Sequence, residues 1–168
     1  MYRRLQMKFG IGQSVARVED KRFVTGTGCY TDDLTPGAGL RVAFLRAPYA
    51  HARLQNLDYS AAVSASGVRL VACQADLDAD QVGDIHCQLQ IENFDGSKMP
   101  MTTKPAMVRD INRNAGDIVA MVVADTQTQA DDAVELIEAS FDHMPAVTDI
   151  YAAMADDAPQ LYDCYKNN

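Results

Sequence analysis

The run Ile118–Ala124 (IVAMVVA) constrains the fold more than any other part of the sequence, because a continuous apolar stretch of this length predicts a strand. Thr126 follows it and Gln129 lies three residues on, so a capping box predicts the start of a helix. The residues on one face of that helix are Ala130, Ala133, Val134 and Ile137. EASFD then predicts another strand. The result is a strand–helix–strand unit, with the helix on one side of a sheet and a right-handed crossover.

A second unit of this kind precedes the first. Residues 40–45 and 54–59 have the pattern of two strands, and Pro48 requires a turn between them, since proline cannot lie inside a central ladder. The residues spaced for one buried face are Val42, Phe44, Ala52 and Leu54. These two strands come before the helix of the unit.

The segment DYSAAVSAS predicts that short helix, capped by Asp58 or Ser60 and closed by Gly67, and a strand follows at Val68–Cys73. A long, irregular excursion over residues 74–114 separates the two units. Together they predict an α+β domain: a mixed sheet built from strand–helix–strand units, with the helices on one face.

The ends of the chain have less pattern. Turn formers dominate residues 10–39 and predict extended segments and loops, whereas DIYAAMADDAP predicts one short helix before an irregular tail. Residues 1–8 are expected to be extended or disordered, which leaves a single domain over residues 9–168. With 48% hydrophobic residues among 168, one core is sufficient.

Charge excludes two classes of partner. The chain has 15 Lys and Arg against 23 Asp and Glu, a formal net charge of -8, so nucleic acid and anionic membrane surfaces would be repelled. No apolar run approaches the roughly 20 residues that cross a bilayer, and no apolar stretch follows the basic N-terminus. We therefore expect a cytoplasmic protein.

Candidate metal ligands do not form a site. The 4 cysteines are scattered without a CxxC pair, which predicts free thiols rather than a zinc or redox motif. Asp76, Asp78 and Asp80 alternate as in a calcium loop. However, Gln81 stands where the tight turn needs glycine, and Cys87 where a bidentate glutamate is needed. A solvated acidic loop is the better prediction.

Candidate nucleophiles and phosphate loops also lack partners. Adjacent His86 and Cys87 point to opposite faces of a strand, and His143 has no nucleophile motif nearby. GIGQSV and TGTGCY each lack a third glycine, so turn glycines explain them better than a dinucleotide site. Asp32 and Asp33 are expected to accept hydrogen bonds from turn N–H groups. No catalytic, cofactor-binding or metal residue is predicted.

The stretch RAPYAHAR (residues 46–53) is predicted to connect two strands, with Pro48 setting the turn. Arg46, His51 and Arg53 give this connection a local cluster of positive charge on an acidic protein. Two roles remain open for them: an interface with other domains or subunits, where arginine suits bidentate pairs, or an internal turn network.

Three separated stretches together resemble a known family: GQSVARVEDKRFVTGTGCYTDDL, FLRAPYAHARLQNLDYSAAVSASGV and GDIVAMVVADTQTQADDAVELIEASFDHMPAVTD. In order and spacing they are similar to the N-terminal region of the large subunit of molybdenum hydroxylases, such as xanthine dehydrogenase, aldehyde oxidase and aerobic carbon monoxide dehydrogenase. The likeness covers residues 9–163 and implies the α/β hammerhead domain. It departs at Ile118, where family members often have proline, and over residues 74–104.

The resemblance implies that the cofactor-binding and catalytic segments of the enzyme lie outside this chain. In the family, the segments that hold molybdopterin and the catalytic glutamate lie beyond this region, so no catalytic or cofactor residue is carried over to this chain. The complete enzyme would hydroxylate an aldehyde or N-heterocycle with water, or oxidise carbon monoxide, and pass electrons through iron–sulfur clusters and FAD. Its partners would be the remaining molybdopterin-binding domains and the iron–sulfur subunit.

The sequence thus predicts a non-catalytic N-terminal scaffold domain of such an oxidoreductase, binding none of these cofactors by itself. The alternative is a self-standing interaction module with the hammerhead fold and no redox chemistry. A domain separated from its neighbours should expose apolar surface, so self-association is also expected.

Overall fold

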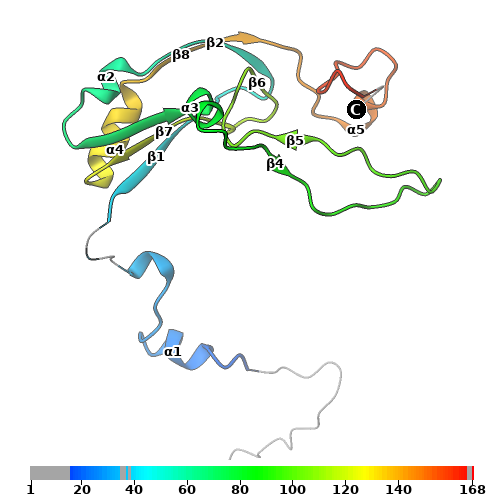
Figure 1. Cartoon of the computed structure of the whole chain (residues 1–168). Coiled ribbons are helices and arrows are strands. Elements are labelled where there is room, and N and C mark those ends of the chain that lie inside the picture. The colour runs from blue at the N-terminus through cyan, green and yellow to red at the C-terminus, as the bar shows by residue number, and fades with distance from the viewer. Residues whose placement is uncertain (1–15, 35–36, 38, 166–167) are drawn as a thin grey trace, which may run out of the picture. The chain divides into compact units, whose positions relative to one another are not determined.

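The computed structural model describes residues 16–34, 37, 39–165 and 168, and the chain divides into two compact units, Met1–Ala38 and Gly39–Asn168 (Figure 1). In the first unit, α1 (Asp20–Val24) is followed by a 3-10 turn at Thr31–Asp33. The sequence predicted only loops and extended segments here, so α1 is a correction. Asp20 in its first turn and Arg22 in its last suit the helix dipole, a local signal that the surrounding turn formers obscured.

The second unit contains two three-stranded sheets, each antiparallel (Figure 1). In the first sheet, β7 (Ile118–Ala124) is central and pairs with β1 (Arg41–Arg46) and β3 (Val68–Cys73). Val119, Ala120, Val122 and Ala124 of β7 are fully buried, as its continuous apolar run predicted. The run is therefore the centre of the sheet.

The largest difference from the predicted topology concerns the second sheet. Its central strand, β2 (Ala52–Asp58), pairs with β8 (Glu138–His143) and the short β6 (Ile111–Asn112). The two strands of each strand–helix–strand unit thus lie in different sheets, and the described strands pair antiparallel rather than in a mixed sheet with a right-handed crossover. Periodicity specifies which side of a strand is buried, but not which strand lies beside it.

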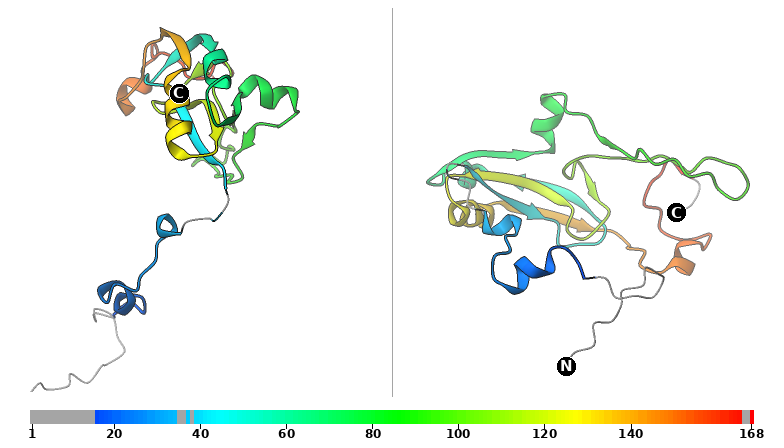
Figure 2. Two further views of the ribbon diagram at one scale, coloured as in Figure 1. Left: turned by 90° about the vertical axis from the view of Figure 1, so that its left-hand side faces the viewer. Right: turned by 90° about the horizontal axis from the view of Figure 1, so that it is seen from below.

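The predicted helices cover one face of the first sheet. α4 (Gln127–Glu135) begins at Thr126, whose side-chain oxygen accepts a hydrogen bond from the Gln129 N–H at 3.3 Å. It lies along β1, and α2 (Ser60–Val63) lies beside it (Figure 2). The prediction that the helices cover one face of a sheet is confirmed, and so is the α+β class.

The core follows from this layering. Its main cluster joins Val71 and Val122 of the sheet to Ala62 of α2 and Ala133 of α4. Small alanines on the helices let them approach the sheet closely, which removes the valines from water. A separate cluster links the two sheets.

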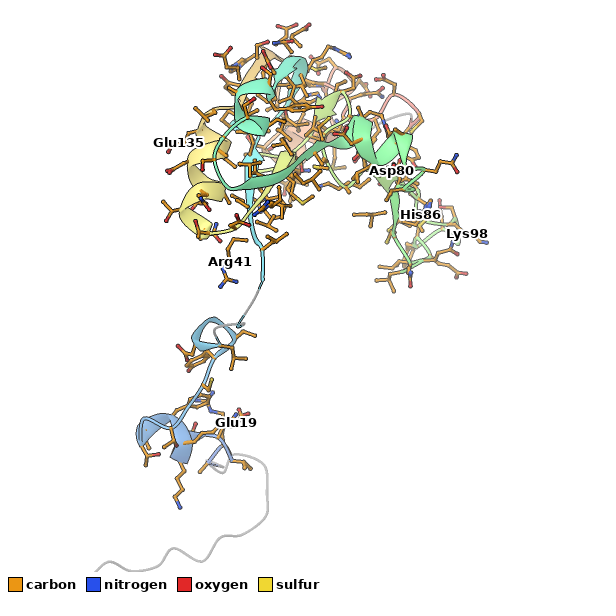
Figure 3. The ribbon with its side chains drawn as sticks, turned by 60° about the vertical axis from the view of Figure 1, so that its left-hand side comes forward. Glu19, Arg41, Asp80, His86, Lys98 and Glu135 are labelled. Carbon is orange, nitrogen blue, oxygen red and sulfur yellow. The ribbon has the colours of Figure 1, made fainter. Side chains whose placement is uncertain are left out.

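The stretch 74–114, predicted to be irregular, contains ordered elements. α3 (Gln74–Ala79) replaces the first part of the predicted acidic loop. A two-stranded ribbon then leaves the body, with β4 (Ile85–His86) paired to β5 (Thr103–Lys104). We call residues 85–104 the arm; Figures 1 and 3 show it projecting from the sheets.

The predicted C-terminal helix is confirmed as α5 (Ile150–Ala153), where the Asp149 carboxylate accepts a hydrogen bond from the Ala152 N–H at 2.9 Å. Within the described part of the chain, every helix is too short or too polar to span a bilayer.

Candidate interaction site

Residues 46–53 carry the chain from the first sheet to the second, because β1 and β2 belong to different sheets. Arg46, at the end of β1, is exposed, and its guanidinium donates a hydrogen bond to the Gly116 carbonyl oxygen at 2.8 Å. The same guanidinium lies 5.6 Å from the centre of the Phe44 ring. Arg46 therefore borders the first sheet on the side where Phe44 is exposed.

His51 lies inside the fold rather than on its surface. The residue is 4% exposed, and its Nδ1 is 2.7 Å from the Pro145 carbonyl oxygen. The His51 carbonyl oxygen accepts a hydrogen bond from the Met144 N–H at 3.1 Å. Nearby, the Tyr49 ring lies 3.9 Å from that of His143. Tyr49 and His51 therefore anchor the connection between the two sheets to the end of β8.

Arg53 is on the exposed side of β2. One guanidinium nitrogen lies 2.7 Å from each carboxylate oxygen of Asp110, with both side chains about half exposed. All three predicted residues therefore have partners within the chain, so an internal turn network is present. None of these contacts tests the interface role.

The first sheet has a second face that the helices do not cover, and we call it the open face: Val42, Phe44, Leu70, Met121 and Val123. Val42 and Leu70 flank Val123, and Phe44 lies beside Met121, in the antiparallel register. Val42 is 40% exposed, Phe44 41% and Leu70 50%. An apolar surface spread over three strands is the kind of patch that marks a protein–protein contact.

The open face corrects one sequence prediction. Val42 and Phe44 were expected to be buried, whereas Ala43 and Leu45 face the helices instead. Every residue from Val42 to Leu45 is apolar, so alternation alone could not choose between the two faces. The close approach of α4 selects the small side chain of Ala43. By contrast, Ala52 is fully buried and Leu54 packs on the cluster between the sheets, as predicted.

A small cavity with a mixed polar and apolar lining lies near the base of the arm. Its volume is about 40 Å³, and Lys104, Arg113, Asp117 and Tyr162 are among its lining residues. Burial of the Asp117 carboxyl favours its neutral form. However, hydrogen bonds from Lys104 and from the Arg113 and Asn114 N–H groups outweigh burial and lower the pKa of Asp117.

The cavity does not fit the molybdopterin that the resemblance implies for the complete enzyme. Small-molecule sites span roughly 300–1,000 Å³, far above this volume. Its cations are also engaged: Lys104 pairs with Asp117, and the Arg113 guanidinium bonds the Leu161 carbonyl oxygen. We therefore derive no chemical step from these residues.

The other candidate sites remain separate. Within the described residues, the cysteines are free thiols and no three His, Cys, Asp or Glu side chains converge as a metal site. Gly26 has a positive φ of 71°, as a turn glycine should, and Asp33 accepts a hydrogen bond from the Tyr30 N–H at 2.8 Å. GIGQSV (residues 10–15) lies entirely outside the described residues, and the side chain of Asp32 is not described.

Sequence reasoning missed two features of this region. Asn112 is fully buried, and its side-chain oxygen has no hydrogen-bond partner within the described chain. Arg109 forms ion pairs with both Asp78 and Asp84. Neither feature has a local motif, because the partners are brought together only by the fold.

The family model for the aldehyde oxidase and xanthine dehydrogenase a/b hammerhead domain matches residues 25–145. The nicotine 6-hydroxylase large subunit of Paenarthrobacter nicotinovorans is 36% identical over 139 residues, covering 83% of this chain and 16% of that protein. The carbon monoxide dehydrogenase large chain of Afipia carboxidovorans is 31% identical over 166 residues, covering 94% and 18%.

Solved structures agree. Quinoline 2-oxidoreductase from Pseudomonas putida 86 superposes with a TM-score of 0.77 at 39% identity, covering 94% of this chain and 19% of that one. The Cu,Mo-CO dehydrogenase gives a TM-score of 0.69 at 32% identity, covering 94% and 18%. The chain thus spans less than a fifth of these relatives. These similarities do not favour the alternative of a self-standing interaction module. The chain belongs to the hammerhead-domain family of aldehyde oxidases and xanthine dehydrogenases.

Proposed function

We propose that this chain is a non-catalytic scaffold domain of the large subunit of a cytoplasmic molybdenum hydroxylase. The remaining molybdopterin-binding domains and the iron–sulfur subunit would supply the cofactors and the reaction. The domain would hold them in position through the open face and the neighbouring 46–53 stretch.

The observation that supports this role is the open face itself. Val42, Phe44 and Leu70 are exposed on three adjacent strands, although the opposite side of the same strands is buried by α2 and α4. Removing such apolar area from water stabilises a contact by about 25 cal/mol per Å² before the costs of association. A rigid sheet also presents this area without ordering a loop.

The charged residues suit the margin of that contact. Arg46 stacks near Phe44 while its guanidinium keeps unused donors, and Arg53 remains half exposed beside Asp110. His51 would act from inside, by holding the 46–53 stretch against the Pro145 carbonyl oxygen. We propose Arg46 and Arg53 as contacts and His51 as their support.

A chimera tests the proposal. The matching segment of quinoline 2-oxidoreductase, which shares 39% identity, would be replaced by residues 25–145 of this chain. The chimera should assemble and turn over quinoline. Phe44→Glu should reduce the yield of assembled enzyme at least about tenfold, because it replaces an apolar ring of the contact with a carboxylate that must lose its water. The double variant of Arg46→Ala and Arg53→Ala should weaken assembly less.

The matched control is Val63→Glu, a substitution at a 53% exposed position on α2, away from the open face. It should leave assembly unchanged. If the Phe44→Glu chimera assembles and reacts like its parent, the open face is not the contact. Unchanged assembly of the double arginine variant would remove the role proposed for 46–53.

A further inference from the structure

The arm carries several large apolar side chains on a segment that projects from the body (Figures 1 and 3). Ile85, Leu89, Ile91 and Met101 are exposed along it, and Phe94 at its tip is fully exposed. Within the described residues, none of the five belongs to a core cluster. Apolar surface gathered on one part of a domain marks a contact with other protein.

The tip of the arm is a tight turn that displays Phe94. The Gly96 N–H donates a hydrogen bond to the Asn93 carbonyl oxygen at 2.9 Å, and Gly96 has a φ of 80°, which glycine adopts without strain. The Asp95 carboxylate accepts hydrogen bonds from the Ser97 N–H at 2.9 Å and hydroxyl at 2.6 Å. Turn chemistry explains the asparagine, aspartate, glycine and serine, but not the phenylalanine.

The base of the arm is held to the body by ion pairs. Arg109 bonds Asp78 and Asp84 at 2.8 to 2.9 Å, and the Lys104 ammonium lies 2.8 Å from the Asp117 carboxylate. Residues 87–91, between base and tip, are irregular. The arm is thus positioned at its base and shaped at its tip. A tip shaped before it binds loses less conformational entropy on docking.

The charges of the arm balance one another. Glu92 and Asp95 are matched by Lys98 and Lys104, so the formal net charge of -8 lies outside the arm. Glu92 and Lys98 are opposite each other in an isolated antiparallel bridge, which brings unlike charges together beside the tip. An exposed aromatic ring with a balanced charged margin suits an apolar pocket with a polar rim.

The comparisons indicate which protein could supply that pocket. The arm lies inside residues 25–145, which match the hammerhead-domain model. The chain spans less than a fifth of each large subunit or large chain that it resembles, so more than four fifths of each relative lies outside the match but in the same polypeptide. Covalent attachment gives such a neighbour an effective concentration in the millimolar range, above that of a separate subunit or a second copy.

We propose that the arm is a docking element that inserts Phe94 into an apolar pocket on the remaining domains of the same large subunit. Leu89, Ile91 and Met101 extend this contact along the arm. The proposal rests on the scaffold role, but it uses neither the open face nor the 46–53 stretch. The domain therefore holds its neighbours through two separate contacts.

The chimera with quinoline 2-oxidoreductase tests the docking. Phe94→Ser should lower the yield of assembled enzyme about tenfold or more, because a buried aromatic anchor commonly contributes at least that factor to affinity. The isolated chain with Phe94→Ser should unfold at the same temperature as its parent, since the ring has no core contact to lose. Val63→Ser, at an exposed apolar position on α2, is the matched control and should assemble like the parent chimera.

Hydrogen–deuterium exchange locates the contact. Peptides from residues 85–104 should exchange rapidly in the isolated chain, because few backbone hydrogen bonds protect the described arm. The same peptides should exchange at least about tenfold more slowly in the assembled chimera, where docking excludes water from them. In the chimera with Phe94→Ser this protection should be lost.

The outcomes separate the arm from the scaffold role. A parent chimera that does not assemble removes the scaffold role, and the docking with it. A chimera that assembles while its arm exchanges as fast as in the isolated chain overturns the docking alone. Protection that appears only when the iron–sulfur subunit is bound, or only as the isolated chain is concentrated, also overturns it, by assigning the arm to that subunit or to a second copy.

Discussion

Arg109 fixes the base of the arm through carboxylates that are far from it in sequence. It bonds Asp78 through two nitrogens at 2.8 and 2.9 Å and also reaches Asp84. The Arg109 guanidinium, followed by the Gln74 amide, lowers the pKa of Asp78 to about 2. The ionised form of the Asp78 carboxyl is therefore more stabilised in the folded chain than in the unfolded one.

The lowered pKa predicts a pH dependence of stability. A carboxyl whose folded pKa is depressed contributes stability above its unfolded pKa, near 3.9, and loses it as pH falls toward 2. Asp78→Asn should thus be less stable than the parent at pH 7, and the difference should vanish near pH 2. Urea unfolding at several pH values measures it. Asp80→Asn is the control, since Asp80 has no ion pair among the described residues; an equal loss there would contradict the assignment.

Gly67 ends the turn after α2 in a conformation that other residues rarely adopt. Its φ is 80°, and a Cβ there would lie within 2.5 Å of atoms of the Gln129 side chain. Gly67→Ala should therefore lower the free energy of unfolding by about 1–2 kcal/mol, from left-handed strain plus displacement of Gln129. Gly83→Ala, where the added Cβ meets nothing within 4 Å, should be nearly neutral. Thermal unfolding of both variants compares them.

At the scale of elements, the two faces of the first sheet should differ in their sensitivity to truncation. Val122 is fully buried beneath α2 and α4, whereas Val42 on the open face is 40% exposed. Val122→Ala should lower the free energy of unfolding by about 2 kcal/mol, and Val42→Ala by less than about 1. Chemical denaturation of the full chain measures both. Equal losses would mean that the open face is covered in solution.

Local patterns predicted most elements but not their partners. The Thr126 cap and the apolar run of β7 each specify an element through neighbouring residues, and both elements formed as expected. Only half of the predicted capping box is present, because the Gln129 side chain accepts from the Thr126 hydroxyl and not from its backbone N–H. Sheet membership, the buried side of β1 and the ion pairs of Arg109 depend on residues distant in sequence. For residues 46–53 only the turn was predictable, because an interface role depends on a partner chain and not on this sequence alone.

At the scale of the whole molecule, the proposed scaffold role predicts the metal content of the purified chain. Three cavities of the described chain measure about 40, 170 and 270 Å³, each below the roughly 300 Å³ at which small-molecule sites begin. Chain purified from cells that make molybdenum cofactor should therefore contain far less than one molybdenum per chain by elemental analysis. Stoichiometric molybdenum, or turnover of an aldehyde or purine by the chain alone, would contradict the role.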